Sequence, residues 1–388
     1  MEMIYLDNCA TTPLDPDVAE TMARVARDCF GNPSSIHAEG RRAARELATA
    51  REAVAAPLCA QPKEIVFASS GTEANNFVIA AVCRLARPDE RVHIITSAAE
   101  HASVYNRLAY EQRADPTRIE VTQVGTDSTG RLRLDELRTA IRPETRLISI
   151  LHCNNETGVL QDLDALFAIR LSYPRILLHL DIVQSYLKVP FDVRSMPADF
   201  LTVSAHKIHG PKGMAMVYVR DGVSAEPLLV GGAQEKYRRA GTENVAAAAG
   251  FARAVQAMPS PNQTRTKYVE LERLFLSTLD SEGAGYAING PTDHERRMPG
   301  ILNLSFHGVR NKEDLLIACD LEGVMLSSAS ACHSGVIAES HVLKAMGLPA
   351  ERLASSVRIG FNRFLNADEV RRGASVLAQC AKRAAARP

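Results

Sequence analysis

Short apolar runs rich in β-branched residues alternate with longer stretches of helical pattern over much of the chain. Such runs predict buried strands at residues 64–69, 92–97, 119–124, 146–152, 176–181, 200–205 and 214–220. Segments long enough for helices lie between the first five runs, for example TEANNFVIAAVCRLAR and DLDALFAIRLS. This alternation predicts parallel crossover units, and therefore an α/β sheet with helices on both faces.

The sheet pattern stops around MPSPNQTR, residues 258–265, where proline and polar residues become frequent. A long helical pattern, TKYVELERLFLSTL, then leads into a mixed remainder. No internal repeat, low-complexity segment or block of like charge interrupts the chain. We therefore expect a domain boundary near residue 258, with a large domain before it and a smaller one after it.

The composition of the chain bears on whether it binds nucleic acid or a membrane. The chain has 388 residues, of which 46% are hydrophobic and 23% charged, as in an ordinary folded protein. Its 45 basic and 45 acidic residues balance, so no basic excess favours direct binding of nucleic acid or of an anionic membrane. No run approaches the ~20 apolar residues that span a bilayer, and the start carries acids where a signal peptide carries bases. We expect a cytoplasmic protein.

The eight cysteines form no CxxC pair and no cluster typical of a metal site or a disulfide framework, so we expect reduced thiols and no bound metal. Most of them, such as Cys83 and Cys319, lie in apolar runs, where cysteine usually serves as a small buried side chain. Cys332 differs, because LSSASACHSG predicts an exposed loop and His333 beside it is able to stabilise a thiolate. A lone cysteine is still more often structural than catalytic, so this residue needs support from others.

Polar residues follow the predicted strands, and in α/β sheets ligands bind beyond the carboxyl ends of the strands. SSGTEANN, after the first strand, places Gly71 and Thr72 at the start of a helix, which suits either a phosphate or an ordinary helix cap. The residues after later strands are Glu100 and His101, Asn154 and Asn155, Asp181 and Gln184, and Ser204, His206 and Lys207. We therefore expect the chemistry at the carboxyl edge of the sheet.

One cofactor, pyridoxal phosphate, uses this combination of side chains. A lysine can form a Schiff base with it, an aspartate can hold its protonated pyridine nitrogen, hydroxyls and a helix N-terminus can bind its phosphate, and a histidine can stack on its ring. Lys207 follows a buried strand and precedes a Gly-Pro-Lys-Gly turn. Taken singly, Lys207 is a loop lysine, Asp181 a helix cap and His101 a structural histidine. Their combination favours the cofactor.

The same blocks resemble a known family across essentially the whole chain, the cysteine desulfurases of the NifS/IscS type within the class V aminotransferase group. The resemblance is carried by YLDNCATTPLDPDV, GNPSSIHAEGRRA, SSGTEANN, NNETGVLQD, HLDIVQS, SAHKIHGPKG, GGAQEKYRRAGTENV, SSASACHSG and SSVRIGFNR. It implies the pyridoxal-phosphate transferase fold of type I, an α/β fold with a large, mainly parallel-sheet domain at 14–258. A smaller α+β domain, formed by 1–13 and 259–388, would carry the catalytic cysteine loop.

The resemblance also implies a role for each site residue. Lys207 would hold the cofactor and move the α-proton, and Cys332 would accept sulfur from L-cysteine as a persulfide, leaving L-alanine. Arg358 and Asn155 would bind the substrate carboxylate. The remaining cofactor contacts would be Asn155 again, Asp181 at the pyridine nitrogen, Gln184 at the ring hydroxyl, His101 as a catalytic residue stacked on the ring, and Gly71, Thr72, Ser204, His206 and Thr242 at the phosphate.

Partners follow from the same resemblance. In similar proteins Thr242 reaches across a dimer interface, so we expect a homodimer. A sulfur-acceptor protein, either a scaffold of iron–sulfur cluster assembly or a dedicated sulfur carrier, would take the persulfide sulfur. The chain ends soon after its last predicted helix, without the longer tail of housekeeping members, which favours a dedicated recipient.

Two alternatives to a desulfurase stay open. His333 stands where similar proteins often have Thr or Ser, and ACHS also resembles selenocysteine lyases, which release selenium from L-selenocysteine. A conventional aminotransferase is the other alternative, in which Cys332 would have no role.

Overall fold

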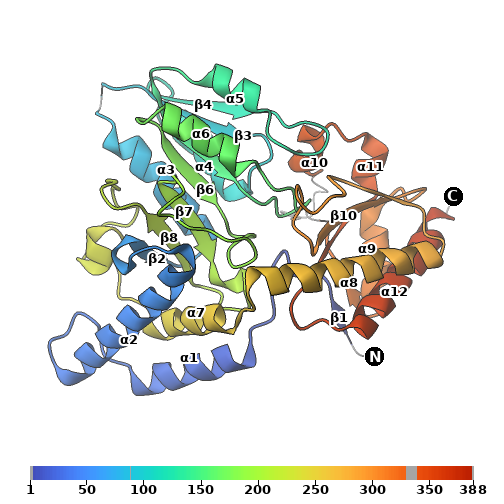
Figure 1. The fold of residues 1–388 in the computed structure, drawn as a ribbon, viewed down its shortest axis with the longest axis horizontal. Helices are drawn as coiled ribbons and strands as arrows, with labels where there is room; N and C mark the ends of the chain where they lie inside the picture. The colour runs from blue at the N-terminus through green and yellow to red at the C-terminus, as the bar shows by residue number, and fades with distance from the viewer. Residues whose placement is uncertain (1–2, 88, 329–338, 387–388) are drawn as a thin grey trace.

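The chain folds around a seven-stranded sheet and a second, smaller core (Figure 1). The computed structural model describes residues 3–87, 89–328 and 339–386. In the large sheet the strands lie in the order β2-β8-β7-β6-β5-β3-β4. Their bounds are β2 (Ile65–Ala68), β3 (Val92–Ser97), β4 (Ile119–Val124), β5 (Thr145–Leu151), β6 (Leu177–Asp181), β7 (Phe200–Ser204) and β8 (Ala215–Val219). The strands predicted up to residue 220 are confirmed, because short apolar β-branched runs suit the buried strands of such a sheet.

One strand of this sheet runs against the others. The strands β3 to β7 pair in parallel, whereas β8 is antiparallel to both of its neighbours, β7 and β2. The predicted parallel crossover from β2 to β3 joins two strands that are not neighbours in the sheet, since β2 lies at the sheet edge beside β8. Because β8 opposes both neighbours, β2 still points the same way as β7. Its carboxyl end therefore reaches the same edge of the sheet as those of the parallel strands.

Helices cover both faces of the large sheet, as predicted. Alternate residues of β2 show the division, because Ile65 and Phe67 join one apolar cluster while Val66 and Ala68 join another. The first cluster includes side chains of α1, α2, α5, α6 and α7, and the second includes those of α3 and α4. The helices are α1 (Pro16–Asp28), α2 (Ala38–Ala55), α3 (Gly71–Leu85), α4 (Ala102–Ala114), α5 (Leu134–Ala140), α6 (Leu163–Ser172) and α7 (Val245–Ala257), with short 3₁₀ turns η1 (Ala56–Leu58), η2 (Pro62–Glu64), η3 (Ala205–Lys207) and η4 (Gln234–Tyr237).

The second core combines a small antiparallel sheet with helices from the C-terminal part of the chain. In this sheet β10 (Ile301–Phe306) lies between β9 (Tyr286–Ile288) and β12 (Ser356–Gly360). The first strand, β1 (Ile4–Tyr5), pairs in parallel with β11 (Val324–Met325). The helices are α8 (Pro261–Ser281), α9 (Lys312–Leu321), α10 (His341–Ala345), α11 (Ala350–Ala354) and α12 (Ala367–Ala385).

The start of α8 marks the passage from one core to the other. Ser260 caps this helix in a reciprocal pair of hydrogen bonds with Gln263, and proline occupies the first helical position. The apolar cluster of the second core draws on Ile4 and Leu6 and otherwise on residues 268–381. We propose that the limits expected from the sequence, 14–258 for the large domain and 1–13 with 259–388 for the small one, divide the molecule.

Candidate active site

A cavity of about 310 Å³ opens at the carboxyl edge of the large sheet. Arg358 reaches it from β12, in the second core. Most of the predicted site residues line it, namely Gly71, Thr72, His101, Asn155, Asp181, Gln184, Ser204, His206 and Lys207. Further lining residues, which were not among the predicted site residues, are Cys9, Ala10, Ser70, Asn75, Ser103, Leu151 and Val183. The structure therefore gathers one set of polar side chains from many separate segments.

Lys207 lies in the 3₁₀ turn that follows β7. Its Nζ donates hydrogen bonds to the backbone carbonyls of Cys9, at 2.5 Å, and Ala10, at 2.7 Å. Burial, with a smaller contribution from the positive charge of Arg358, lowers the pKa of Lys207 to about 8. An amine with this pKa is partly uncharged near neutral pH, so it can act as a nucleophile or a base.

Asp181 is the last residue of β6, and its side chain is fixed by two donors. Its Oδ2 accepts a hydrogen bond from Asn75 Nδ2 at 2.8 Å, and its Oδ1 accepts one from the backbone N–H of Val183 at 3.0 Å. Asn75 also donates to Ser103 Oγ, while its own Oδ1 is buried without a partner in the described parts of the chain. The one sequence signal for Asn75 is an amide on the otherwise apolar buried face of α3. The carboxylate of Asp181 is thereby held in one orientation inside the cavity.

His101 and Gln184 also line the cavity. His101 caps α4, and its Nδ1 accepts a hydrogen bond from the backbone N–H of Ser103 at 3.1 Å. Burial lowers the pKa of His101, although the nearby charge of Asp181 acts in the opposite direction. The ring is therefore neutral at physiological pH. Gln184 donates from Nε2 to the carbonyl of Cys9 at 2.9 Å.

The start of α3 forms part of the cavity wall, since Gly71 and Thr72, its first two residues, line the cavity. The first N–H groups of a helix have no intrahelical acceptor and are therefore able to bind an anion. A Cβ placed on Gly71 would lie 3.4 Å from Val183 Cγ2 and 3.6 Å from Ser204 Cβ, so it would occupy the space over the helix start. Burial, with the charge of Lys207, lowers the pKa of His206 to about 4. This part of the wall suits an anion held by hydroxyl and N–H donors.

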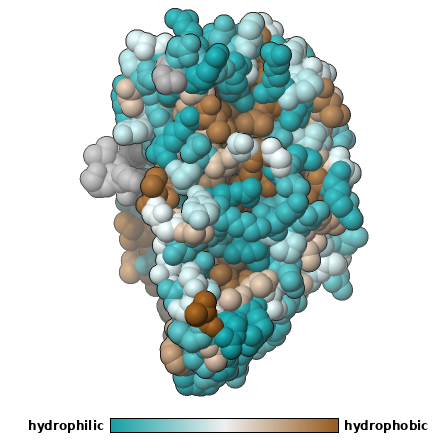
Figure 2. Space-filling model, turned by 90° about the vertical axis from the view of Figure 1, so that its left-hand side faces the viewer, coloured by the Kyte–Doolittle hydropathy of each residue, from teal (hydrophilic) through white to brown (hydrophobic). Residues whose placement is uncertain are grey.

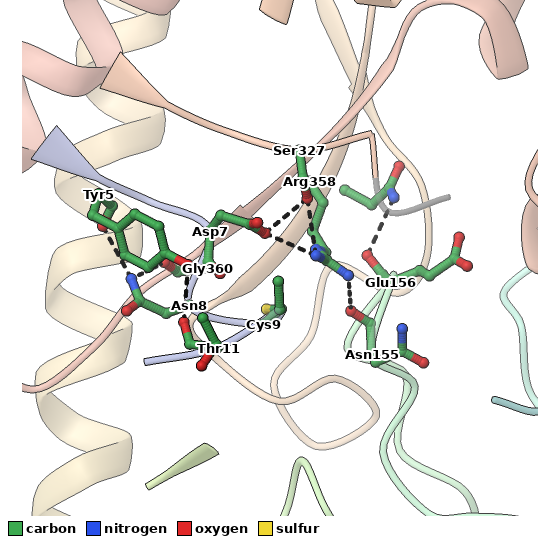
Figure 3. Close-up of polar contacts among 12 residues, drawn as sticks. Tyr5, Asp7, Asn8, Cys9, Thr11, Asn155, Glu156, Ser327, Arg358 and Gly360 are labelled. Atoms are coloured by element: carbon green, nitrogen blue, oxygen red, sulfur yellow. Dashed lines mark hydrogen bonds and ion pairs between the residues drawn. The ribbon is translucent and has the colours of Figure 1, made fainter. Parts of the chain in front are cut away.

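Another part of the cavity wall is built around Arg358, whose polar contacts are shown in Figure 3. Its guanidinium contacts Asp7, Ser327 and the backbone carbonyl of Asn155. Asn155 itself lines the cavity. A buried guanidinium beside an amide suits a carboxylate ligand.

The N-terminal segment 7–12 lies between the two cores and completes the cavity. Asn8 Nδ2 donates to the carbonyl of Gly360 in β12 at 2.8 Å. Thr12 Oγ1 donates to the carbonyl of His206 at 2.9 Å, on the side of the large sheet. The block YLDNCATTPLDPDV contains this segment, but its local pattern does not place it at the site.

Of the remaining predicted residues, one lies elsewhere in the structure and the other falls outside the described part of the chain. Thr242 lines a different cavity of the same chain, together with Ser69, Glu235 and Arg239. Cys332 lies outside the described residues. Two described serines lie on either side of the segment 329–338 that contains it: Ser327 Oγ is 2.9 Å from Arg358 Nη2, and Ser340 Oγ donates to Glu156 Oε2 at 2.5 Å.

Comparisons with known proteins agree with this architecture. The aminotransferase class-V family pattern matches residues 4–372. A curated cysteine desulfurase of Nostoc sp. is 39% identical over 384 residues, which cover 99% of this chain and 94% of the relative. A solved NifS-like protein has a TM-score of 0.87 at 32% identity, covering 97% of this chain and 98% of its own. The solved structure described as SspA in complex with cysteine has a TM-score of 0.81 at 31% identity, covering 92% and 98%. The chain therefore belongs to the class-V aminotransferase family, and within it to the cysteine desulfurases of the NifS/IscS type.

Proposed function

We propose that this chain is a pyridoxal-phosphate-dependent cysteine desulfurase, a sulfurtransferase that converts L-cysteine into L-alanine and passes the sulfur to Cys332 as a persulfide. The observation that carries the proposal is the meeting of Lys207, Asp181 and Arg358 in one cavity. A lysine of lowered pKa suits covalent attachment of a pyridoxal cofactor, and a fixed buried carboxylate suits its protonated pyridine nitrogen. A buried guanidinium suits the carboxylate of an amino-acid substrate.

The residues of the cavity fit this cofactor. The start of α3, with Thr72, Ser204 and His206 around it, would bind the phosphate, and the missing Cβ of Gly71 leaves the room for it. Asp181 would hold a proton on the pyridine nitrogen. When bound, pyridoxal phosphate supplies an electron sink for the bonds at Cα of an amino acid.

The remaining roles belong to side chains that hold or move atoms of the substrate. Lys207 would hold the cofactor covalently and then take the proton from Cα. His101, neutral because it is buried, would stack on the cofactor ring, and Gln184 would face its ring hydroxyl. Arg358 and Asn155 would hold the substrate carboxylate, so that Cα and its sulfur-bearing neighbour point into the cavity.

Cys332 would act as the sulfur acceptor. Its thiolate would attack the sulfur of the substrate, so that a sulfur–sulfur bond forms as the bond between sulfur and Cβ breaks. Protonation of the remaining carbon fragment gives L-alanine. The bonds of Ser327 to Arg358 and of Ser340 to Glu156 support this role, because these two residues lie on either side of the segment 329–338 that contains Cys332.

The active species would be a homodimer. Thr242 lies outside the cavity of its own chain, in agreement with a role at the phosphate of a second copy. Leu229, Val230 and Tyr237, in the same part of the chain, are exposed by 43%, 85% and 73%. Figure 2 shows hydrophobic residues exposed among hydrophilic ones on the side of the molecule that carries α2, α3 and β8. Light scattering that finds a fully active monomer would reject the dimer.

The persulfide sulfur would pass to a second protein, a scaffold or a dedicated sulfur carrier, in the cytoplasm. Among residues 3–87, 89–328 and 339–386, no helix combines the length and the apolar character that crossing a membrane requires. Incubation of the persulfide form with cell extract, followed by identification of the labelled protein, would name the acceptor.

The experiment that tests the function compares wild type with Cys332→Ala, using L-cysteine and L-selenocysteine as substrates and alanine as the measured product. The variant should keep the visible absorbance of the bound cofactor and respond spectrally to cysteine, because Lys207, Asp181 and Arg358 are unchanged. It should form no alanine from cysteine. Full cysteine desulfuration by the variant would refute Cys332 as acceptor. Wild-type protein that is inert towards cysteine but active on selenocysteine would replace the proposal with a selenocysteine lyase.

A further inference from the structure

We propose that Asp7 is a positioning residue that fixes Arg358 for the carboxylate of the substrate. The inference rests on the proposed function, since it takes an amino-acid carboxylate as the ligand of Arg358. Asp7 was not among the predicted site residues and does not line the cavity, but its side chain contacts Arg358, which does.

The guanidinium of Arg358 is held by three protein groups (Figure 3). Nη2 donates to Asp7 Oδ1 at 2.8 Å and to Ser327 Oγ at 2.9 Å. Nη1 donates to the carbonyl of Asn155 at 3.0 Å. Nε is buried too, but it has no partner among the described residues. The guanidinium is therefore fixed by the protein, and Nη1, which makes one of its two possible hydrogen bonds among the described residues, keeps a donor for a ligand.

Asp7 is itself fixed in place. Ser327 Oγ donates to the same Oδ1 at 2.8 Å, and the backbone of Asp7 forms a bridge with Gly360 of β12. The side chains of Asp7 and Arg358 are 19% and 5% exposed, so solvent and salt screen their attraction only weakly. The pair therefore holds one geometry before any ligand arrives.

Asp7 acts on a carboxylate ligand in two opposite ways. Its hydrogen bond keeps Arg358 from leaving the cavity, so less conformational freedom is lost when the ligand binds. Its negative charge repels a second carboxylate at the same guanidinium. Replacement by Asn separates the two effects, because the amide oxygen can still accept from Nη2 while the charge is removed. Replacement by Ala removes both effects at once.

The test measures cysteine turnover by the holoenzyme carrying Asp7→Ala, Asp7→Asn or Asp17→Ala. Asp17 is the matched control, since it pairs with Arg253 outside the cavity and is 60% exposed. Asp7→Ala should raise KM for L-cysteine by about 10-fold and change kcat by less than about threefold, the pattern of lost uniform binding. Asp7→Asn should have a KM no higher than wild type, and Asp17→Ala should match wild type.

Cysteamine, which is cysteine without its carboxylate, gives a second readout. Its affinity is measured from the change in visible absorbance on addition to the holoenzyme. The Asp7→Ala variant should bind L-cysteine more weakly than wild type in this assay and should bind cysteamine with unchanged affinity. If Asp7→Ala does not fold, as judged by thermal melting, Asp7→Ser takes its place with the same expectation, because the shorter hydroxyl side chain cannot reach Arg358.

Three outcomes would overturn the inference: equal losses for cysteine and cysteamine, a wild-type KM in the Ala or Ser variant, or a KM in Asp7→Asn as high as in Asp7→Ala. Wild-type protein that does not convert L-cysteine would instead overturn the proposed function, so the two failures are distinguishable.

Discussion

Buried polar side chains occupy both the interior of the large sheet and the cavity at its edge, but they are bonded differently. In the sheet, the two ring nitrogens of His179 face the hydroxyls of Ser149, at 2.8 Å, and Thr202, at 3.0 Å. In the cavity, Asn75 Oδ1 and Arg358 Nε are buried and have no partner within the parts of the chain that the structure describes. Buried polar groups are normally bonded, so such exceptions call for a ligand or another explanation.

The contrast teaches that burial alone does not separate structural from functional polar residues, and that the partners of each buried group have to be considered as well. His179 and Asp181 lie two residues apart on β6 and are 0% and 2% exposed. His179 finds its partners within the sheet, whereas Asp181 presents its carboxylate to the cavity. Three experiments test this division, in order of decreasing effect.

The largest effect is expected for Lys207→Ala. Loss of the base and of the covalent link should lower cysteine turnover by roughly 10³-fold or more and remove the visible absorbance. The thermal melt of the apoprotein should change little, because the bonds that Lys207 Nζ makes within the described residues go to two backbone carbonyls, those of Cys9 and Ala10. Lys63→Ala, at a surface ion pair, is the control and should keep full activity. A Lys207→Ala protein with wild-type absorbance and turnover would contradict the assignment of Lys207 as a functional residue.

The opposite pattern is expected for His179→Ala. The change leaves a cavity and deprives the hydroxyls of Ser149 and Thr202 of a partner, at a cost of about 3 kcal/mol of unfolding free energy. Turnover per folded molecule should stay close to wild type. Urea unfolding gives the stability, and activity normalised to bound cofactor gives the turnover. Unchanged stability with lost turnover would place His179 among the functional residues.

A smaller effect is expected from acid. Burial lowers the pKa of His179 to about 3 and the pKa values of His93 and His152 to about 4. Because histidine in the unfolded chain titrates near pH 6.5, the stability from these residues is complete above that pH and is lost as pH falls below it. Each contributes a slope of up to about 1.4 kcal/mol per pH unit.

Urea unfolding at pH 7.5, 6.5 and 5.5 measures this slope. The slope should be shallower in His179→Gln than in wild type. The exposed His307→Gln serves as the control and should keep the wild-type slope. Equal slopes in all three proteins would contradict the assignment of His179 as a neutral residue of the sheet.

The strands of the large sheet could be predicted from the sequence because each is a short apolar run that is recognisable from its own residues. The order of the strands could not, since the place of β8 depends on pairings such as Ile65 with Tyr218, which no local pattern records. The same limit explains why the edge position of β2 was missed.

The site residues likewise differ in whether the local sequence pattern could place them. Lys207, Asp181 and His101 could be placed together because each lies at or just after the end of a strand, and these strands end at one edge of the sheet. Arg358 lies within β12, and nothing in its local pattern connects it with that edge; only the resemblance pointed to it. Asp7 was missed for the same reason, because its partner is 351 residues away.

The N-terminal segment 7–12 has a consequence for the timing of synthesis. A ribosome makes this segment first and Gly360, the partner of Asn8, 352 residues later. At roughly 5 to 20 residues per second, the interval between the synthesis of Asn8 and that of Gly360 is roughly 20 to 70 seconds. The strands of the large sheet all leave the ribosome before then. The cavity is therefore completed only after most of the chain has been made, because Arg358 and the partner of Asn8 are both synthesised late.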